Sequence, residues 1–182
     1  MPFPRIPTPA LGVAAALLGC AAVAATVGDI DLGADVAGSI ETMIEIDAPP
    51  GVVWATFSDT DSYGDWNPML RRVSGEWTVG QTLDVSLGDA TAFEMRPRVV
   101  VARDAAELRW VTAMGWIPGL FDAEHFFILE DTGSGTTRLR HGETVSGFLA
   151  YIVRPRMSET TRLAFGEMNA ALKAQVEARA GT

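Results

Sequence analysis

The sequence predicts an α+β fold, in which a curved antiparallel sheet of seven strands surrounds a long C-terminal helix and two short helices follow the first strand. Segments rich in β-branched and aromatic residues, bounded by Gly, Asp or Pro, follow one another from residue 73 to residue 146. From residue 155 onward, apolar residues recur mostly at steps of three and four, the period of an amphipathic helix. With 182 residues, 48% of them apolar, the chain is long enough for one well-packed core.

The first strand is expected at residues 39–47, where Ile40, Thr42, Ile44 and Ile46 alternate imperfectly with polar residues until two prolines follow. Pro49 and Pro50 suit the start of a helix, which should end near Ser58. Residues 59–70 form a loop or a second short helix. Within that segment, Pro68 forces Asn67 away from helical torsions.

Six more strands and the long helix complete the expected fold. Strands that are adjacent in sequence usually pair, so the six should form a meander. One helix, predicted from Pro155 to Gly181, can cover only one face of such a sheet. The six strands are expected at Val73–Val79, Thr82–Leu87, Ala92–Ala102, Glu107–Met114, Ala123–Glu130 and Thr136–Ser146.

Residues 1–28 form a separate hydrophobic segment, followed by a linker at residues 29–38 and the folded domain at residues 39–180. The stretch from Ala10 to Val27 carries no charge and lies near the lower limit of about 17–25 residues for a transmembrane helix. Arg5 precedes it and acidic residues follow, which places the domain outside the cytoplasm. The segment is therefore expected to anchor the domain to a membrane.

Two other fates of this segment stay open. Ala22-Val23-Ala24 has the small-x-small form that a signal peptidase accepts, and cleavage there would give a secreted protein. Leu17-Leu18-Gly19-Cys20 resembles a lipobox, which would make Cys20 the lipidated N-terminus of a lipoprotein. The apolar residues that continue after Cys20 disfavour the lipoprotein, since a lipidated protein usually continues into a polar tether.

The charge balance argues against nucleic acid as a partner. The 14 Lys and Arg residues face 23 Asp and Glu residues, a net charge of −9, and no basic run is longer than Arg71-Arg72. Binding to a phosphate backbone requires a basic stripe. One cysteine and two histidines, His125 and His141, form no recurrent ligand pattern, so neither a metal nor a cofactor is expected. The sequence leaves the oligomeric state open.

Several short motifs follow one another across the expected domain. Their order and spacing resemble those of the START and Bet v 1-like (SRPBCC) superfamily, in particular its bacterial polyketide cyclase/dehydrase-like branch. The resemblance covers residues 39–177 and rests on Ile46-Asp47-Ala48-Pro49-Pro50 with Val53-Trp54, Tyr63 with Trp66-Asn67-Pro68, Ser74-Gly75-Glu76 with Val79-Gly80, Arg109-Trp110, Gly119-Leu120-Phe121-Asp122, Glu124-His125-Phe126, Gly135-Thr136-Thr137-Arg138, His141-Gly142-Glu143, Phe165 with Met168-Asn169, and Ala171-Leu172-Lys173.

The resemblance implies a helix-grip fold that encloses a hydrophobic cavity. Members of the superfamily include lipid carriers, binders of plant hormones and flavonoids, and aromatase/cyclases, so the family implies a fold far more narrowly than a function. The resemblance also places Trp66 and the loop from Trp116 to Phe121 near the cavity mouth. These aromatic side chains are candidates for a gate.

On the expected strand 136–146, Leu139, His141, Glu143 and Val145 share one face because side chains alternate along a strand. That face is expected to line the cavity. His141 and Glu143 could satisfy each other there, contact a ligand, or act as weak candidates for acid-base catalysis. These alternatives stay open.

The register of the preceding strand decides which side chains meet on that face. In one register, Glu124 lies opposite Glu143, and two adjacent carboxyls would raise one pKa. In the register shifted by one residue, His125 lies opposite Glu143 and Phe127 opposite His141. We favour the second arrangement, with a charge-assisted pair between His125 and Glu143.

The expected function is the binding or carriage of a hydrophobic small molecule, lipid-like or polyketide-like, in the cavity. The alternatives are a cyclase/dehydratase-type enzyme that uses a cavity His or Glu, and a protein-interaction module without a ligand. No nucleophile motif or phosphate loop supports the enzyme. The expected ligand contacts are Trp66, Trp116, Phe121, His125, Leu139, His141, Glu143 and Phe165.

Overall fold

The computed structural model describes residues 38–88, 93–113, 121–147 and 150–180 and confirms the predicted fold class. Strands and helices follow in the expected order, with two short helices and a helical turn after the first strand. The elements are β1 (Ser39–Ile46), α1 (Pro50–Phe57), the 3-10 helix η2 (Thr60–Ser62), α2 (Tyr63–Trp66), β2 (Leu70–Ser74), β3 (Asp84–Leu87), β4 (Phe93–Met95), β5 (Arg98–Arg103), β6 (Glu107–Ala113), β7 (Asp122–Asp131), β8 (Thr137–Ser146) and α3 (Ala150–Ala180).

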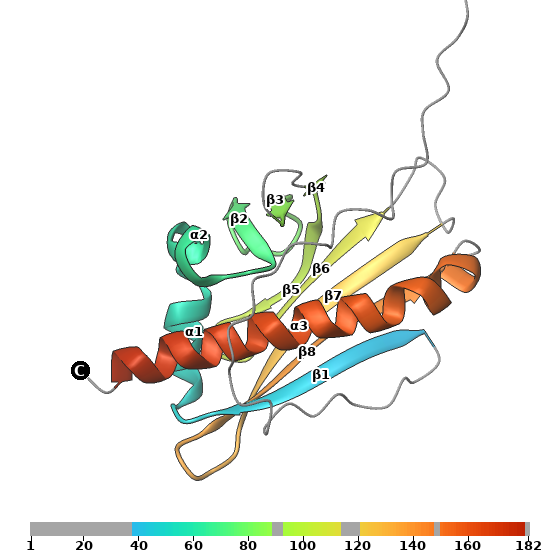
Figure 1. Ribbon diagram of the computed structural model, residues 1–182. Coiled ribbons are helices and arrows are strands. Elements are labelled where there is room, and N and C mark those ends of the chain that lie inside the picture. Colours follow the sequence, from blue (N-terminus) through green and yellow to red (C-terminus); the bar gives the residue numbers. More distant parts are fainter. Residues whose placement is uncertain (1–37, 89–92, 114–120, 148–149, 181–182) are drawn as a thin grey trace, which may run out of the picture.

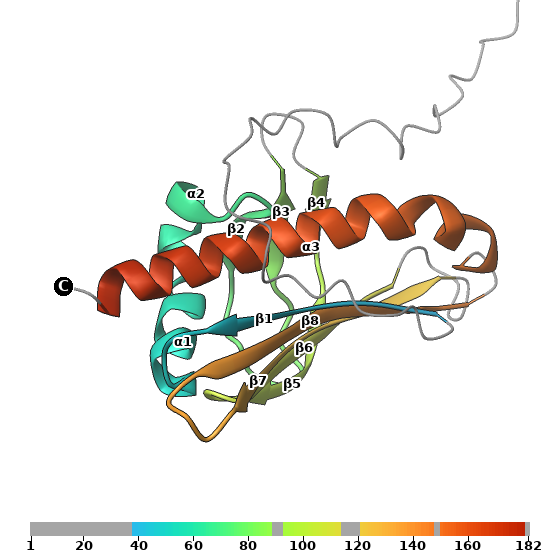
Figure 2. The same ribbon diagram turned by 60° about the horizontal axis from the view of Figure 1, so that its bottom comes forward.

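Five of the strands form one antiparallel sheet in the order β1-β8-β7-β6-β5, and β2, β3 and β4 form a smaller sheet. Helix α3 runs along the length of the larger sheet, and α1 and α2 lie beside its C-terminal half (Figures 1 and 2). We call the side of the larger sheet that faces α3 the inner face. The helix thus lies against the sheet as expected for a helix-grip fold.

The predicted count of seven strands is corrected to eight. The segment expected as one strand, Ala92–Ala102, is divided into β4 and β5 by Arg96 and Pro97. Proline has no backbone N–H and cannot donate within a ladder, so it breaks a strand or marks its edge. The break lets the chain change from the smaller sheet to the larger one.

Backbone hydrogen bonds link the two sheets at this corner. The N–H groups of Gly80 and Leu83 donate to the carbonyl oxygens of Val99 and Pro97, both at 2.9 Å. The N–H of Val99 donates in turn to Gln81 at 2.9 Å. These hydrogen bonds therefore join the smaller and the larger sheet into one curved wall.

Strand β2 lies earlier than the predicted Val73–Val79. It begins at Leu70, where the side-chain oxygen of Asn67 accepts the backbone N–H groups of Met69 and Leu70 at 3.0 and 2.8 Å. It ends at Ser74 because Gly75 has a φ of +115°, which no strand residue adopts. Asn67 itself is extended, as the following proline predicted.

Helix α3 begins at Ala150, five residues before the predicted start at Pro155. The prediction placed the proline in the first turn, where its missing N–H has no cost. One turn of helix in fact precedes the proline, which loses a single backbone hydrogen bond.

No helix within the described ranges is long and apolar enough to cross a membrane.

The main core lies between α3, the short helices and the inner face of the sheet. Met168, Leu172 and Val176 of α3 are buried against it. Phe57 of α1 and Tyr63 of α2 also enter this core, and the Tyr63 hydroxyl donates to the carbonyl oxygen of Phe57 at 2.5 Å. The short helices are therefore attached to the core at the end where α3 finishes.

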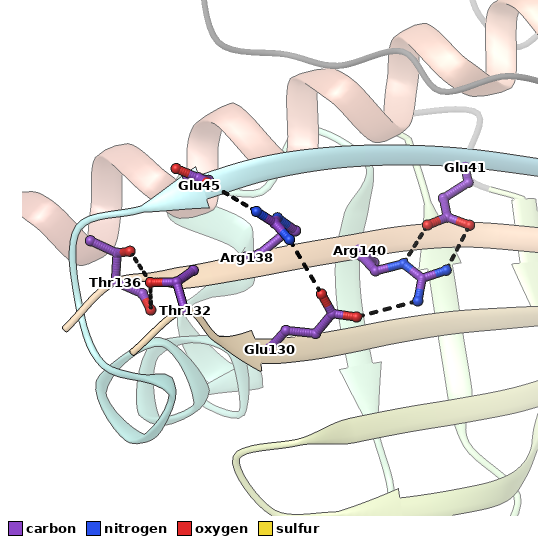
Figure 3. A network of polar contacts seen from close by, with 7 residues as sticks. All are labelled: Glu41, Glu45, Glu130, Thr132, Thr136, Arg138 and Arg140. Carbon is purple, nitrogen blue, oxygen red and sulfur yellow. Dashed lines mark hydrogen bonds and ion pairs between the residues drawn. The ribbon is translucent and has the colours of Figure 1, made fainter. Parts of the chain in front are cut away.

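The outer face of the larger sheet carries charges that pair across its strands (Figure 3). Arg140 on β8 contacts Glu41 of β1 at 2.6 Å and Glu130 of β7 at 3.3 Å. Arg138 contacts Glu45 at 3.1 Å and Glu130 at 3.9 Å. Exposed ion pairs contribute about 0–1 kcal/mol each, so this network balances the charge of the surface more than it stabilises the fold.

Candidate functional site

Trp110, His125 and Glu143 lie side by side on the inner face, on the neighbouring strands β6, β7 and β8. His125 is the register partner of Trp110 on one side and of Glu143 on the other. We call these three residues the polar row. The favoured register is confirmed, and the alternative with Glu124 opposite Glu143 is wrong.

The two histidines of the chain are hydrogen-bonded to each other. His125 Nε2 and His141 Nε2 lie 2.8 Å apart, and both side chains are buried. Aromatic rings enclose the pair: Phe165 of α3 stacks on His141 at 4.2 Å between ring centroids, and Trp110 stacks on His125 at 5.3 Å. Alternation along β7 and β8 therefore brings both imidazoles under α3.

Asn169 and Thr42 determine which nitrogen of His141 carries a proton. The Thr42 hydroxyl donates to the carbonyl oxygen of His141 at 3.1 Å, so its oxygen is free to accept from Asn169 Nδ2 at 2.9 Å. Asn169 Oδ1 lies 2.8 Å from His141 Nδ1 and can only accept. His141 is therefore protonated at Nδ1, its Nε2 accepts, and His125 donates from Nε2.

Burial keeps both histidines neutral. Burial and then the neighbouring His141 hold the pKa of His125 well below its ordinary value of 6.5. Burial lowers the pKa of His141 to about 3, although hydrogen bonds to Asn169 and to the backbone of Phe165 oppose that shift. At neutral pH the pair is an uncharged hydrogen-bonded relay with fixed tautomers.

Glu143 marks the place where the inner face becomes accessible. Its side chain is half-buried, whereas His141, two residues before it, is fully buried. Burial raises the pKa of Glu143 from 4.5 to about 7. The predicted charge-assisted pair between His125 and Glu143 is wrong, because the Nε2 of His125 bonds to His141 instead and the imidazole stays neutral.

Two buried side-chain donors of the described residues lack a hydrogen-bond acceptor, namely Trp110 Nε1 and Asn67 Nδ2. Trp110 is only 1% exposed, so water does not freely solvate its indole N–H. A buried donor without an acceptor is costly and rare in native proteins. Trp110 Nε1 is therefore a donor of the polar row that no acceptor among the described residues satisfies.

Other predicted ligand residues lie elsewhere. Trp66 is in α2, where its indole N–H donates to Ser62 Oγ at 3.0 Å and its ring meets Tyr63. Leu139 is part of the main core. Phe121 packs with Ala123 in a second cluster. Trp116 lies outside the described residues, so the structure brings together only His125, His141, Glu143 and Phe165 of the predicted set.

Sequence reasoning missed three residues of this site: Thr42, Trp110 and Asn169. Trp110 was recognised only as part of the motif Arg109-Trp110 and not as a site residue. Thr42 and Asn169 are polar residues at positions where the periodic pattern of their strand or helix requires an apolar one, and both are fully buried. A polar residue on a buried stripe is the signal that could have identified them.

A separate open depression of about 350 Å³ lies on the outside of the domain. Two tryptophans, Trp54 and Trp77, meet edge to face in it with centroids 5.6 Å apart. None of the predicted ligand residues lines it. Among the described residues, no cluster of three His, Cys, Asp or Glu side chains could hold a metal ion.

A family model described as "Polyketide cyclase / dehydrase and lipid transport" matches residues 37–177. The chain belongs to this family. The polyketide cyclase/dehydrase and lipid transport domain thus includes every strand and most of α3, and the family supports a ligand-binding SRPBCC domain. No curated protein matches the chain.

Solved structures share the fold of this polyketide cyclase/dehydrase and lipid transport domain. A protein from Rhodobacter sphaeroides is 15% identical, with 82% of this chain and 99% of that one covered and a TM-score of 0.65. A START superfamily protein from Mycobacterium smegmatis is 16% identical over 76% and 97%, with a TM-score of 0.58. DynU16, a protein of the dynemicin biosynthetic locus, is 18% identical over 77% and 47%, with a TM-score of 0.61. At these identities the similarity shows the fold alone.

Proposed function

We propose that the domain binds and carries a hydrophobic small molecule between its inner face and the N-terminal half of α3. The observation that carries this proposal is the interruption of the core. Phe121 and Ala123 pack with Val145 in a cluster separate from the main core, and His125 and Glu143 of the polar row lie between the two. An apolar cluster that continues past buried polar groups and is only partly covered at Val145 is typical of a ligand site.

The family supports this proposal at the level of chemistry. Its description joins cyclase/dehydrase members with lipid transport, and lipids are largely apolar molecules. Residues 114–120 and 148–149, which follow or precede the proposed ligand site in the sequence, lie outside the described parts of the chain. The loop from Trp116 to Phe121 is proposed as its gate.

A molecule that co-purifies with the full chain tests the proposal. We expect solvent extraction and mass spectrometry to recover an apolar compound from the wild-type protein. Val145→Trp, which fills the inner face of β8, should reduce its recovery at least about tenfold, because a steric block removes the apolar contacts. Thr144→Trp, one residue away on the outer face, is the matched control and should retain the compound. Equal recovery from both variants, or none from any of the proteins, would contradict carriage.

A second candidate is proton-transfer chemistry of the cyclase or dehydratase type, which one observation favours. The raised pKa of Glu143, about 7, suits a general acid or base at neutral pH. The same extraction separates the two functions. An enzyme would accumulate an unconverted substrate of different mass in Glu143→Gln, whereas a carrier would hold the same compound.

The hydrophobic segment at residues 1–28 is proposed to anchor the domain at the outer side of a membrane. Its uncharged stretch from Ala10 to Val27 and the preceding Arg5 support this proposal. We expect the full chain to sediment with membranes, to require detergent for release, and to keep its N-terminal residues by intact mass. Cleavage after Ala24 with soluble protein would indicate secretion instead. A lipid on Cys20 that Cys20→Ser abolishes would indicate a lipoprotein.

A further inference from the structure

The hydrogen-bonding capacity of the polar row restricts the polar group of the ligand. Trp110 Nε1–H is a donor only, is buried, and has no acceptor. A group that satisfies this donor must accept a hydrogen bond. A purely hydrocarbon ligand would leave this donor unsatisfied.

His125 offers the complementary group. Its Nε2 donates to His141, because Asn169 fixes the proton of His141 at Nδ1. The Nδ1 of His125 therefore carries a lone pair. No hydrogen bond reaches that nitrogen from the described residues. A ligand group that donates a hydrogen bond would satisfy it.

The surroundings favour a neutral group over an anion. None of the described inner-face residues of β1, β6, β7 and β8 is lysine or arginine. The histidine pair is uncharged, and Glu143 would repel a carboxylate or phosphate whenever it is ionised. An anionic headgroup would thus find no opposite charge among the described inner-face residues of these four strands.

Resting on the proposed function, we infer that the ligand presents a neutral hydroxyl, alcohol or phenol, that accepts from Trp110 Nε1–H and donates to His125 Nδ1. Trp110 and His125 are register partners, and their indole and imidazole rings stack at 18° with centroids 5.3 Å apart, so the two side chains share one region of the inner face. A ketone or an ether would accept from Trp110 Nε1–H but could not donate to His125 Nδ1. An ammonium would donate to His125 Nδ1 but could not accept from Trp110. A hydroxyl satisfies both.

Three probes of matched shape test the inference: 2-naphthol, 2-methoxynaphthalene and 2-naphthoate, titrated calorimetrically into the full chain. We expect 2-naphthol to bind about tenfold more tightly than the methyl ether, which cannot donate, and 2-naphthoate to bind most weakly. Trp110→Phe keeps a ring but removes the donor, and should abolish most of this preference. Trp77→Phe, in the outer depression, is the control and should keep it.

A measurement on the wild-type protein covers the case in which Trp110→Phe does not fold. The ¹⁵N spectrum should show His125 protonated at Nε2, and 2-naphthol should shift the indole N–H of Trp110 downfield. Equal affinities for 2-naphthol and its methyl ether would mean that water, and not the ligand, bonds to Trp110 Nε1 and His125 Nδ1. That result would overturn the inference but leave the proposed binding of an apolar molecule intact. Failure of all three probes together with no co-purified compound would overturn the proposed function itself.

Discussion

Acidification from pH 7 to pH 5 is expected to destabilise the Glu143→Gln variant by about 4 kcal/mol, and the wild-type domain by about half as much. The two buried histidines cause the loss. In the unfolded chain each takes up a proton near its ordinary pKa of 6.5, whereas in the folded state both pKa values are depressed. The unfolded state therefore binds more protons below pH 6.5, and stability falls as the pH decreases.

Glu143 opposes this effect in the wild-type protein. Its folded-state pKa is raised to about 7 from 4.5, so the folded state binds the extra proton between these values. Its contribution to stability is complete below pH 4.5 and is lost as the pH rises through 7. Replacement by glutamine removes the stabilisation that Glu143 gains on protonation. The variant therefore loses more stability on acidification than the wild-type protein does.

Urea unfolding at pH 7 and pH 5, at constant ionic strength, measures both proteins. Glu130→Gln makes the same substitution on the outer face of β7 and controls for the loss of a negative charge. Added to Glu143→Gln, His125→Phe should reduce the acid loss by about half, because one of the two buried histidines is removed. A Glu143→Gln variant that is equally stable at both pH values would show that the histidines are protonated in the folded state, contrary to the relay.

Gly142→Ala is expected to destabilise the domain by about 2–4 kcal/mol. A Cβ at Gly142 would overlap the carbonyl oxygen of Ile40 and lie 2.5 Å from Phe126 Cζ. The Ile40 oxygen belongs to the backbone of β1, the strand beside Gly142, so it cannot move without disturbing that pairing. The ring of Phe126 is itself held over Gly142, with the Arg109 guanidinium 5.1 Å from its centroid.

Gly51→Ala is the matched control for this substitution. Gly51 lies in α1, and a Cβ there would meet no atom within 4 Å. Alanine favours a helix over glycine by up to about 1 kcal/mol, so the control should be neutral or stabilising. Denaturant midpoints measure both variants. A Gly142→Ala protein with wild-type stability would show that β1 and β8 can separate at this point without cost.

The hydrophobic pattern was sufficient to predict the fold because periodicity is a local property. Alternation identified the strands and the steps of three and four identified the long helix, since each depends on residues close together in the chain. The errors arose where one residue overrides the pattern. Pro97 divides a strand, Gly75 ends one, and Pro155 was given too much weight as a helix start.

The sequence by itself determined the helix-grip class, the order of its elements and the inward direction of His141 and Glu143. Only the tertiary structure decided what the histidines do. Their tautomers depend on Thr42 and Asn169, which are 127 residues apart and share a hydrogen bond only because α3 lies across β1 and β8. Two polar atoms form a hydrogen bond only when their separation is correct to within a few tenths of an ångström. The packing of remote segments sets that separation, and no local pattern encodes it.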